Sequence, residues 1–325
     1  MILIFDICFL DYFPLCSLCP LWQKGVQMKI LECVPNFSEG RDDEKVEKIV
    51  AQVRRTPGVK LLDHFSDPDH NRTVMTFIGE PEAVKQAALQ SSLKALELID
   101  MRTHRGEHPR IGAVDVVPFV PIGGLAMQEA VRMAHQFGRE FGERGEVPVY
   151  FYGEAATDAR RKKLADVRKG EYEGLREKLS IPGWEPDAGA RTFHPRSGAT
   201  IVGARLPLIA FNVNLRTQNL DLAKKIARRI RESNGGIPSV QALGLELQEK
   251  GMVQVSMNLT NYRQASIPKV LEFIRAEITG TGVEIAETEL VGLLPMGALE
   301  DVVREYLKMP EFDSDRVIET HLLSE

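Results

Sequence analysis

The feature that most constrains this chain is an order of strands and helices that occurs twice. In the first half, strand-like runs at 29–34, 59–63, 73–78 and 113–119 alternate with amphipathic helical runs near 46–53 and 84–99. In the second half, strand-like runs at 208–214, 240–246, 253–259 and 283–293 enclose helical runs at 223–230 and 267–274. Both halves therefore predict β-α-β-β-α-β, the order of a split βαβ unit.

This repeat predicts an α+β fold made of two related halves. A split βαβ sheet carries its helices on one face, so its other face needs a cover. Two such halves bury their open faces by packing sheet against sheet with the helices outside, and we expect a functional site at that seam. The predicted subdomains span residues 28–205 and 206–325.

Residues 1–27 differ in composition from the rest of the chain. They hold three of the four cysteines (Cys8, Cys16 and Cys19), and their apolar run is broken by acidic residues and prolines. This pattern fits neither a signal peptide nor a membrane span. We therefore interpret this segment as a non-native or disordered extension, with Met28 as the working start. Only Cys33 remains after it, which favours a reducing, cytoplasmic compartment. The net charge of −5 argues against nucleic-acid binding.

The candidate chemistry is concentrated in residues 101–115, MRTHRGEHPRIGAVD, between a predicted helix and a predicted strand. His108 precedes a proline, which disfavours helix at that position, so its imidazole lies at a break in regular structure. An imidazole titrates near neutrality and can both accept and return a proton. The turn supplies further polar candidates, namely His104, Arg105, Glu107, Arg110 and Asp115.

The same turn also matches the H-x-x-E-H string of zinc peptidases, with His104 and His108 as ligands. That motif requires a helix, on which the two histidines share a face. Gly106 and Pro109 both argue against a helix here, so we expect no metal. A non-catalytic binding module is a further alternative.

Other residues are candidates for ligand binding. Asn71 and Arg72 begin a strand, and an arginine fork suits a carboxylate, although a surface arginine is an equally good interpretation. Asn36 is either a turn residue or a ligand contact. Asn212 and Asn214 either line the seam or face water. The loop 189–198 combines flexible backbone, an aromatic ring and two arginines, which suits either a linker or a site for a heteroaromatic ring with a carboxylate tail. Its residues are Gly189, Ala190, Arg191, Thr192, Phe193, His194, Pro195, Arg196, Ser197 and Gly198.

Several long motifs occur in one order along the chain: CVPNFSEGR, NRTVMTFIG, HRGEHPRIGAVDVVPFVP, VPVYFYGEAA and GATIVGAR followed by LIAFNVNL. Together they resemble the glutamate formimidoyltransferase family, the formiminotransferase unit of histidine breakdown. The resemblance extends from about residue 29 to past residue 293. It does not cover residues 1–27, and we expect no cyclodeaminase domain after the formiminotransferase unit.

The resemblance implies two ferredoxin-like subdomains that face each other, usually in a cytoplasmic homodimer. It implies transfer of the formimino group of N-formimino-L-glutamate to N5 of tetrahydrofolate, a co-substrate. His108 matches the general acid–base histidine, and residues 189–198 match the folate-binding segment. Either Glu107 or Asp115 would orient the imidazole, and Arg72, Arg105 or Arg110 would hold the substrate carboxylates. Formyl exchange between 5-formyltetrahydrofolate and glutamate is the nearest alternative reaction.

Overall fold

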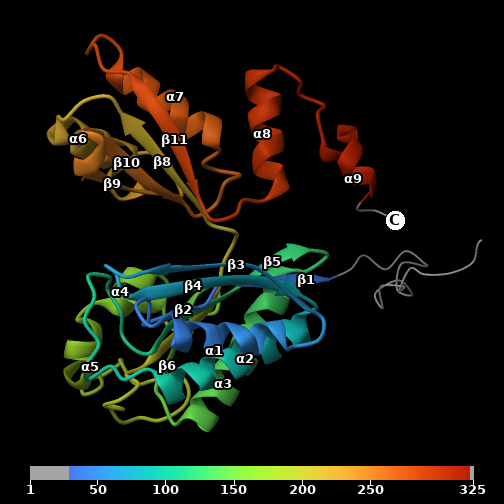
Figure 1. Cartoon of the computed structure of the whole chain (residues 1–325), viewed down its shortest axis with the longest axis vertical. Helices are drawn as coiled ribbons and strands as arrows, with labels where there is room; N and C mark the ends of the chain where they lie inside the picture. The colour runs from blue at the N-terminus through green and yellow to red at the C-terminus, as the bar shows by residue number, and fades with distance from the viewer. Residues whose placement is uncertain (1–28, 323–325) are drawn as a thin grey trace, which may run out of the picture.

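The computed structural model describes residues 29–322, so the extension predicted for residues 1–27 lies outside the described residues. The fold is α+β, with a mixed seven-stranded sheet in the first half and an antiparallel four-stranded sheet in the second (Figure 1). The first sheet contains β1 (Ile30–Cys33), β2 (Asn36–Phe37), β3 (Val59–Asp67), β4 (Arg72–Gly79), β5 (Val114–Gly123), β6 (Val149–Gly153) and β7 (Thr200–Ala204). The second contains β8 (Ile209–Leu215), β9 (Val240–Leu247), β10 (Met252–Leu259) and β11 (Ile285–Val291).

The two sheets share one strand order. In the first, β1 and β2 act as one interrupted strand that pairs antiparallel with β4 on one side and β5 on the other, and β3 pairs with β4. In the second, β8 lies between β10 and β11, and β9 pairs with β10. Each half thus places its first strand in the centre, beside its third and fourth strands. The predicted β-α-β-β-α-β order is present in both halves.

Three helices cover one face of the first sheet: α1 (Asp43–Arg54), α2 (Pro81–Leu98) and α3 (Met127–Gly145). The periodic residues of α1 are all buried, namely Val46, Ile49, Val50 and Val53. Asp42 caps this helix by accepting a hydrogen bond from the Lys45 amide. In the second half, α6 (Leu220–Ile230) and α7 (Ile267–Ile278) bury apolar side chains against the alternate residues of β8 and β10. Two further helices follow, α8 (Met296–Tyr306) and α9 (Ile318–Leu322).

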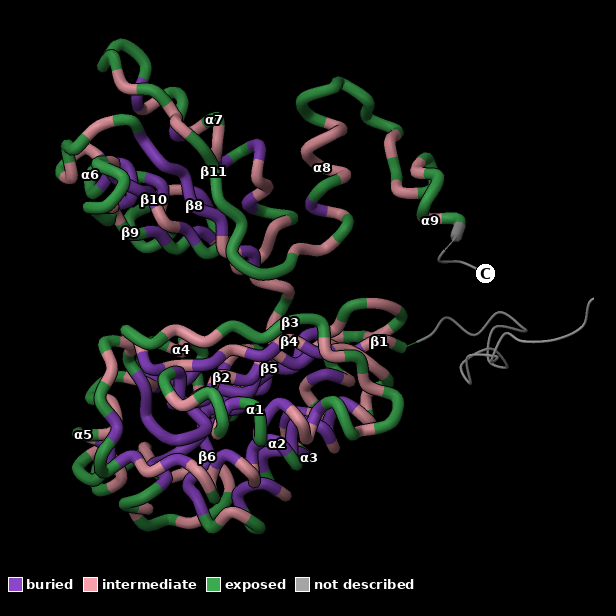
Figure 2. Tube along the Cα trace, in the orientation of Figure 1, coloured by how far each residue is buried: buried purple, intermediate pink, exposed green. Residues whose placement is uncertain are grey.

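The expectation that the second face of the first sheet is bare was wrong over part of that sheet. At β5, β7 and β6 this face is covered by residues 159–193, which include α4 (Leu164–Arg168) and α5 (Glu171–Lys178). Val167 and Leu175 are buried there against Tyr150 and Ile201. In the sequence, many charged residues surround these isolated apolar residues, so no periodic pattern marks the segment as a cover for the sheet. The outer strand β3 remains largely exposed (Figure 2).

The strand-like runs predicted at 59–63 and 73–78 were also too short. β3 continues to Asp67, opposite Arg72 of β4, so only a short turn joins the two strands. Figure 1 shows the second half on the β3 side of the first sheet, joined through the segment after β7. Within residues 29–322, no helix combines the length and apolar character needed to cross a bilayer.

Candidate active site

Residues 99–113 form no helix and connect α2 to β5 as an ordered turn. The Met101 amide donates to the Arg196 carbonyl and the Ala113 amide to the Ser197 carbonyl, both at 2.8 Å. A Cβ on Gly106 would lie 2.2 Å from the His70 carbonyl oxygen, so only glycine allows the turn to approach β4 this closely. His104 and His108 therefore do not share a helix face. No cluster of three potential metal-binding side chains occurs in the described chain.

His108 is partly buried beside the first residue of β4. The Arg72 Nη1 and the His108 Nε2 are 2.6 Å apart. Because a guanidinium is always a donor, Nε2 accepts this hydrogen bond, and the neutral ring carries its proton on Nδ1. The His70 ring meets the His108 ring edge to face, with centroids 6.0 Å apart. His70 is itself paired through Nδ1 with Asp67.

The surroundings of His108 keep its imidazole neutral. Burial, followed by the positive charges of Arg72 and Arg168, lowers the pKa of His108 to about 3, and a backbone hydrogen bond at Pro109 opposes the shift. At neutral pH the ring is therefore a base without a proton on Nε2. A base with so low a pKa is weak, however, because general bases work best with a pKa near the operating pH.

Arg168 reaches this region from the end of α4. Its Nη2 pairs with the Asp115 carboxylate, which is 1% exposed. The other Asp115 oxygen accepts a hydrogen bond from the Ile111 amide at 3.0 Å. Asp115 thus holds Arg168 and the turn, rather than contacting the imidazole. Both Arg72 and Arg168 have a buried Nε that lacks a hydrogen-bond partner.

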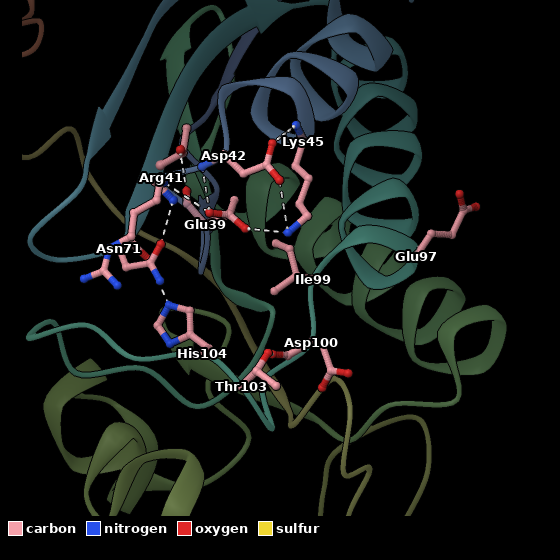
Figure 3. A network of polar contacts seen from close by, with 12 residues as sticks. Glu39, Arg41, Asp42, Lys45, Asn71, Glu97, Ile99, Asp100, Thr103 and His104 are labelled. Carbon is pink, nitrogen blue, oxygen red and sulfur yellow. Dashed lines mark hydrogen bonds and ion pairs between the residues drawn. The ribbon is translucent and has the colours of Figure 1, made fainter.

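Asn71 connects three segments around the site and adopts a left-handed φ of 48°. Its Oδ1 accepts from the Gly40 amide at 3.0 Å, and its Nδ2 donates to the Arg105 carbonyl at 2.9 Å. Its own carbonyl is 3.0 Å from His104 Nε2. Figure 3 shows Asn71 between His104 and the turn that carries Glu39. His104 is 6% exposed, and burial lowers its pKa, so it serves as an internal support.

Arg110 ties the turn to α5. Its guanidinium is 6% exposed and forms a bidentate pair with the Glu173 carboxylate, at 2.7 and 2.8 Å. It also contacts Glu171 at 3.0 Å, and its Nε donates to His104 Nδ1 at 3.3 Å. The hydrogen bonds to Glu173 raise the pKa of Arg110. Arg110 is therefore occupied by protein carboxylates and stabilises the turn.

The loop 189–198 lies against the turn and α5. Phe193 packs beside the Tyr172 ring, with centroids 5.5 Å apart, and the Arg176 guanidinium lies 4.9 Å from its centre. The Tyr172 hydroxyl donates to the Pro195 carbonyl. Arg196 donates to carbonyls at the end of α2, while Arg191 is exposed. The loop is thus anchored at its C-terminal end and presents a half-buried aromatic ring.

The structure brings some of the sequence candidates together and separates others. His108 and Arg72 are in contact. Asp115 does not contact either of them and instead pairs with Arg168. Glu107 and Arg105 are exposed, and Arg105 lines an open hollow of about 460 Å³ with Gly106, Arg110, Gly170, Glu171 and Glu173. Asn36 is half-buried, and its side chain donates to the Val34 carbonyl.

Two residues beside His108 were missed. Arg168 gave no signal because it lies in a charged segment far along the chain. His70 lies just before the Asn71-Arg72 pair, and this position was a usable clue.

In the second half, the amides predicted either to line the seam or to face water are buried on the sheet face opposite α6 and α7. Asn214 is 0% and Asn212 is 8% exposed. They donate to the carboxylates of Glu287 and Glu289, at 3.0 and 3.1 Å, and Gln254 donates to the Asn214 side-chain oxygen at 2.9 Å. A polar network therefore occupies the middle of this face.

Known proteins of one family match nearly all of the described chain. Residues 30–205 match the model of the formiminotransferase domain, N-terminal subdomain, and residues 210–320 match the model of the formiminotransferase domain. A glutamate formimidoyltransferase of Streptococcus pyogenes serotype M1 is 45% identical over 91% of this chain and 99% of that protein. One from Thermoplasma acidophilum is 45% identical over 90% of this chain and 97% of that protein. The formimidoyltransferase-cyclodeaminase of Rattus norvegicus is 44% identical over 86% of this chain and 52% of its own length.

Proposed function

The chain belongs to the formiminotransferase family, and on that premise we propose how its residues carry out the family reaction. The protein is a glutamate formimidoyltransferase, a one-carbon transferase of histidine degradation. It moves the formimino group from N-formimino-L-glutamate to N5 of tetrahydrofolate and releases L-glutamate. A bond forms between N5 and the formimino carbon, and the bond from that carbon to the glutamate nitrogen breaks.

The general acid–base group in this proposal is His108. Its neutral Nε2 accepts the proton that N5 loses as it attacks the formimino carbon, and the imidazolium then protonates the departing glutamate nitrogen. The contacts of the partly buried ring with Arg72 and His70 support this assignment, because they hold a neutral imidazole in a fixed orientation. One positioned acid–base group typically contributes about 10²–10⁴-fold in rate.

We assign the folate contact to residues 189–198. The half-buried Phe193 ring, held between Tyr172 and Arg176, offers a stacking surface for a heteroaromatic ring. The exposed Arg191 is suited to a carboxylate tail. The backbone hydrogen bonds from this loop to residues 101 and 113 tie its position to the turn that carries His108.

We also propose that the chain consists of two ferredoxin-like subdomains, 28–205 and 206–325, which close sheet to sheet around the substrates. The common strand order of the two sheets supports this division, as do family matches that meet between residues 205 and 210. The polar face with Asn212 and Asn214 would then border the seam. We propose a cytoplasmic homodimer as the working form, and the buried free thiol of Cys33 suits a reducing compartment.

The test is a transfer assay that follows loss of tetrahydrofolate and formation of its 5-formimino derivative by mass spectrometry. The wild type should use formiminoglutamate, and a parallel arm with 5-formyltetrahydrofolate and glutamate measures the formyl alternative. H108Q should lose about 10²–10⁴-fold in kcat while it still binds tetrahydrofolate. Near-normal turnover by H108Q would remove this residue from the chemistry. The substitution H64Q, on the exposed strand β3, controls for loss of an imidazole.

A further inference from the structure

One contact in the site opposes the chemistry assigned to it. The lone pair on Nε2 of His108 is the atom that must accept a proton, yet Arg72 Nη1 already donates to it at 2.6 Å. A neutral imidazole has only one such lone pair. While Arg72 occupies it, the ring cannot take the proton of an attacking amine. The protein without substrate therefore holds its base in a capped state.

The two arginines in this region have more donors than the protein satisfies. Among the side chains that the structure describes, Arg72 and Arg168 each bury an Nε without a partner. Asp115 pairs with Arg168. The nearby carboxylates are otherwise engaged, since Asp67 holds His70 and Glu173 holds Arg110. Two guanidinium groups thus share one close carboxylate, which leaves an excess positive charge beside the imidazole.

The polar and charged groups in the region around His108 come from four places. Arg72 lies at the start of β4, His70 in the turn before it, Arg168 at the end of α4 and Asp115 at the start of β5. Of the positive groups, only Arg72 contacts the His108 ring through a hydrogen bond, and its Nη1 has no carboxylate partner among residues 29–322. Arg72 is therefore the group that an incoming anion can draw away from the ring.

We propose that Arg72 is a carboxylate-responsive cap on His108. A carboxylate of the amino-acid substrate binds between Arg72 and Arg168, takes over the Arg72 guanidinium and leaves Nε2 of His108 free for the proton of N5. The inference rests on the proposed function and deepens it, because it makes the carboxylate part of the activation of the base. A formimino compound without a carboxylate would leave the cap in place.

The cap also accounts for the weakness of the base in the free protein. Burial lowers the pKa of His108 most, and among the charged groups the positive charge of Arg72 lowers it most. When a carboxylate neutralises the arginine, this effect decreases and the imidazole becomes a stronger base. The stronger base would then exist only when the donor substrate is bound.

The direct test is an NMR titration of the His108 ring nitrogens in ¹⁵N-histidine-labelled full-length protein, with L-glutamate as the probe. In the wild type, L-glutamate should shift the Nε2 resonance toward that of a free acceptor nitrogen. In R72Q the resonance should lie near that position already and respond several-fold less. R72K should recover part of the response, and R54Q, on the exposed end of α1, should behave as wild type. Calorimetry measures L-glutamate binding in the same samples.

The pH profile provides a second readout that a purely structural role would not alter. The profile of kcat/KM reports the free enzyme and that of kcat reports the bound complex. In the wild type, the acid limb of kcat should lie at higher pH than that of kcat/KM. In R72Q the two limbs should coincide, with kcat/KM for formiminoglutamate reduced at least about 100-fold.

The outcomes separate the two claims. If the wild type binds L-glutamate without a change at Nε2, or if R72Q responds as fully as the wild type, the cap is refuted and the transferase function stands. If the wild type fails to transfer the formimino group, the proposed function is refuted independently of the NMR result.

Discussion

The buried, neutral state of His108 predicts a specific loss of stability in acid. The pKa of this imidazole falls from its ordinary 6.5 to about 3 in the folded protein. The unfolded chain therefore binds a proton that the folded chain refuses when the pH lies between these values. Since the unfolded state binds more protons, the free energy of unfolding decreases as the pH falls through this window.

The size of this loss in the free energy of unfolding follows from the pH range between the unfolded and folded pKa values of His108. At about pH 4 the unfolded histidine is protonated and the folded one is still mostly neutral, which corresponds to about 2.5 pK units at about 1.4 kcal/mol each. The ring is partly exposed, so solvent screening reduces the result to about 2–3 kcal/mol. H108Q should lack this contribution. The wild type should therefore lose about 2–3 kcal/mol more than H108Q between about pH 7 and pH 4.

Urea unfolding of both proteins, at several pH values, measures the difference. Trp184 packs against Tyr150 in the first half and reports on the unfolding of that half when Trp22 is replaced by phenylalanine. Far-UV circular dichroism checks that the transition is the same by a second probe. H64Q serves as the histidine control. If the free energy of unfolding changes by the same amount in the wild type and in H108Q between pH 7 and pH 4, the imidazole is not held neutral by its surroundings.

Three further substitutions test the support of the site. Tyr172→Phe removes the hydroxyl that holds the Pro195 carbonyl, and isothermal calorimetry should show tetrahydrofolate binding weakened by about 1 kcal/mol, or roughly five-fold. Arg110→Gln breaks the bidentate pair with Glu173, and urea unfolding should give a loss of about 1–3 kcal/mol, together with a higher KM for tetrahydrofolate. Gly112→Ala places a Cβ at 2.1 Å from the Ala199 carbonyl oxygen, which should lower the free energy of unfolding by about 2–3 kcal/mol.

The regular elements were predictable because their burial is periodic in the sequence. Helix α6 shows the reason, since Ala223, Ile226, Ala227 and Ile230 are spaced for one face and are all buried. The strand β10 alternates in the same predictable way, with Val253, Val255, Met257 and Leu259 directed to the helices. The strand order inside each sheet needed the structure, because the sequence pattern gives the order of elements along the chain and not their pairing.

The site was only partly predictable, because its contacts join distant segments. His108 stood out through its local chemistry, and the proline after it indicated the break in helix. In the sequence, a surface position and a ligand contact were equally good interpretations of Arg72, and the structure places its Nη1 2.6 Å from His108 Nε2. Arg168 could not be found, because a charged helix of five residues shows no pattern that distinguishes a site arginine from a solvated one.

The two halves are unequal in length, and the proposed acid–base residue lies in the longer one. Both sheets share a strand order, but the first continues through α3, β6, α4, α5 and β7 before the chain reaches the second. This added segment supplies Arg168 and residues 189–198, and it covers the sheet face beside β5. Burial lowers the pKa of His108, and the charge of Arg168, which the segment supplies, contributes to the same effect. In the second half, where no such segment covers the sheet, the corresponding face carries an amide–carboxylate network that needs no unusual protonation state. The His108 proposal thus assigns proton transfer to the half that carries the extra layer of chain, and it leaves the amide side chains of the other half to donate hydrogen bonds.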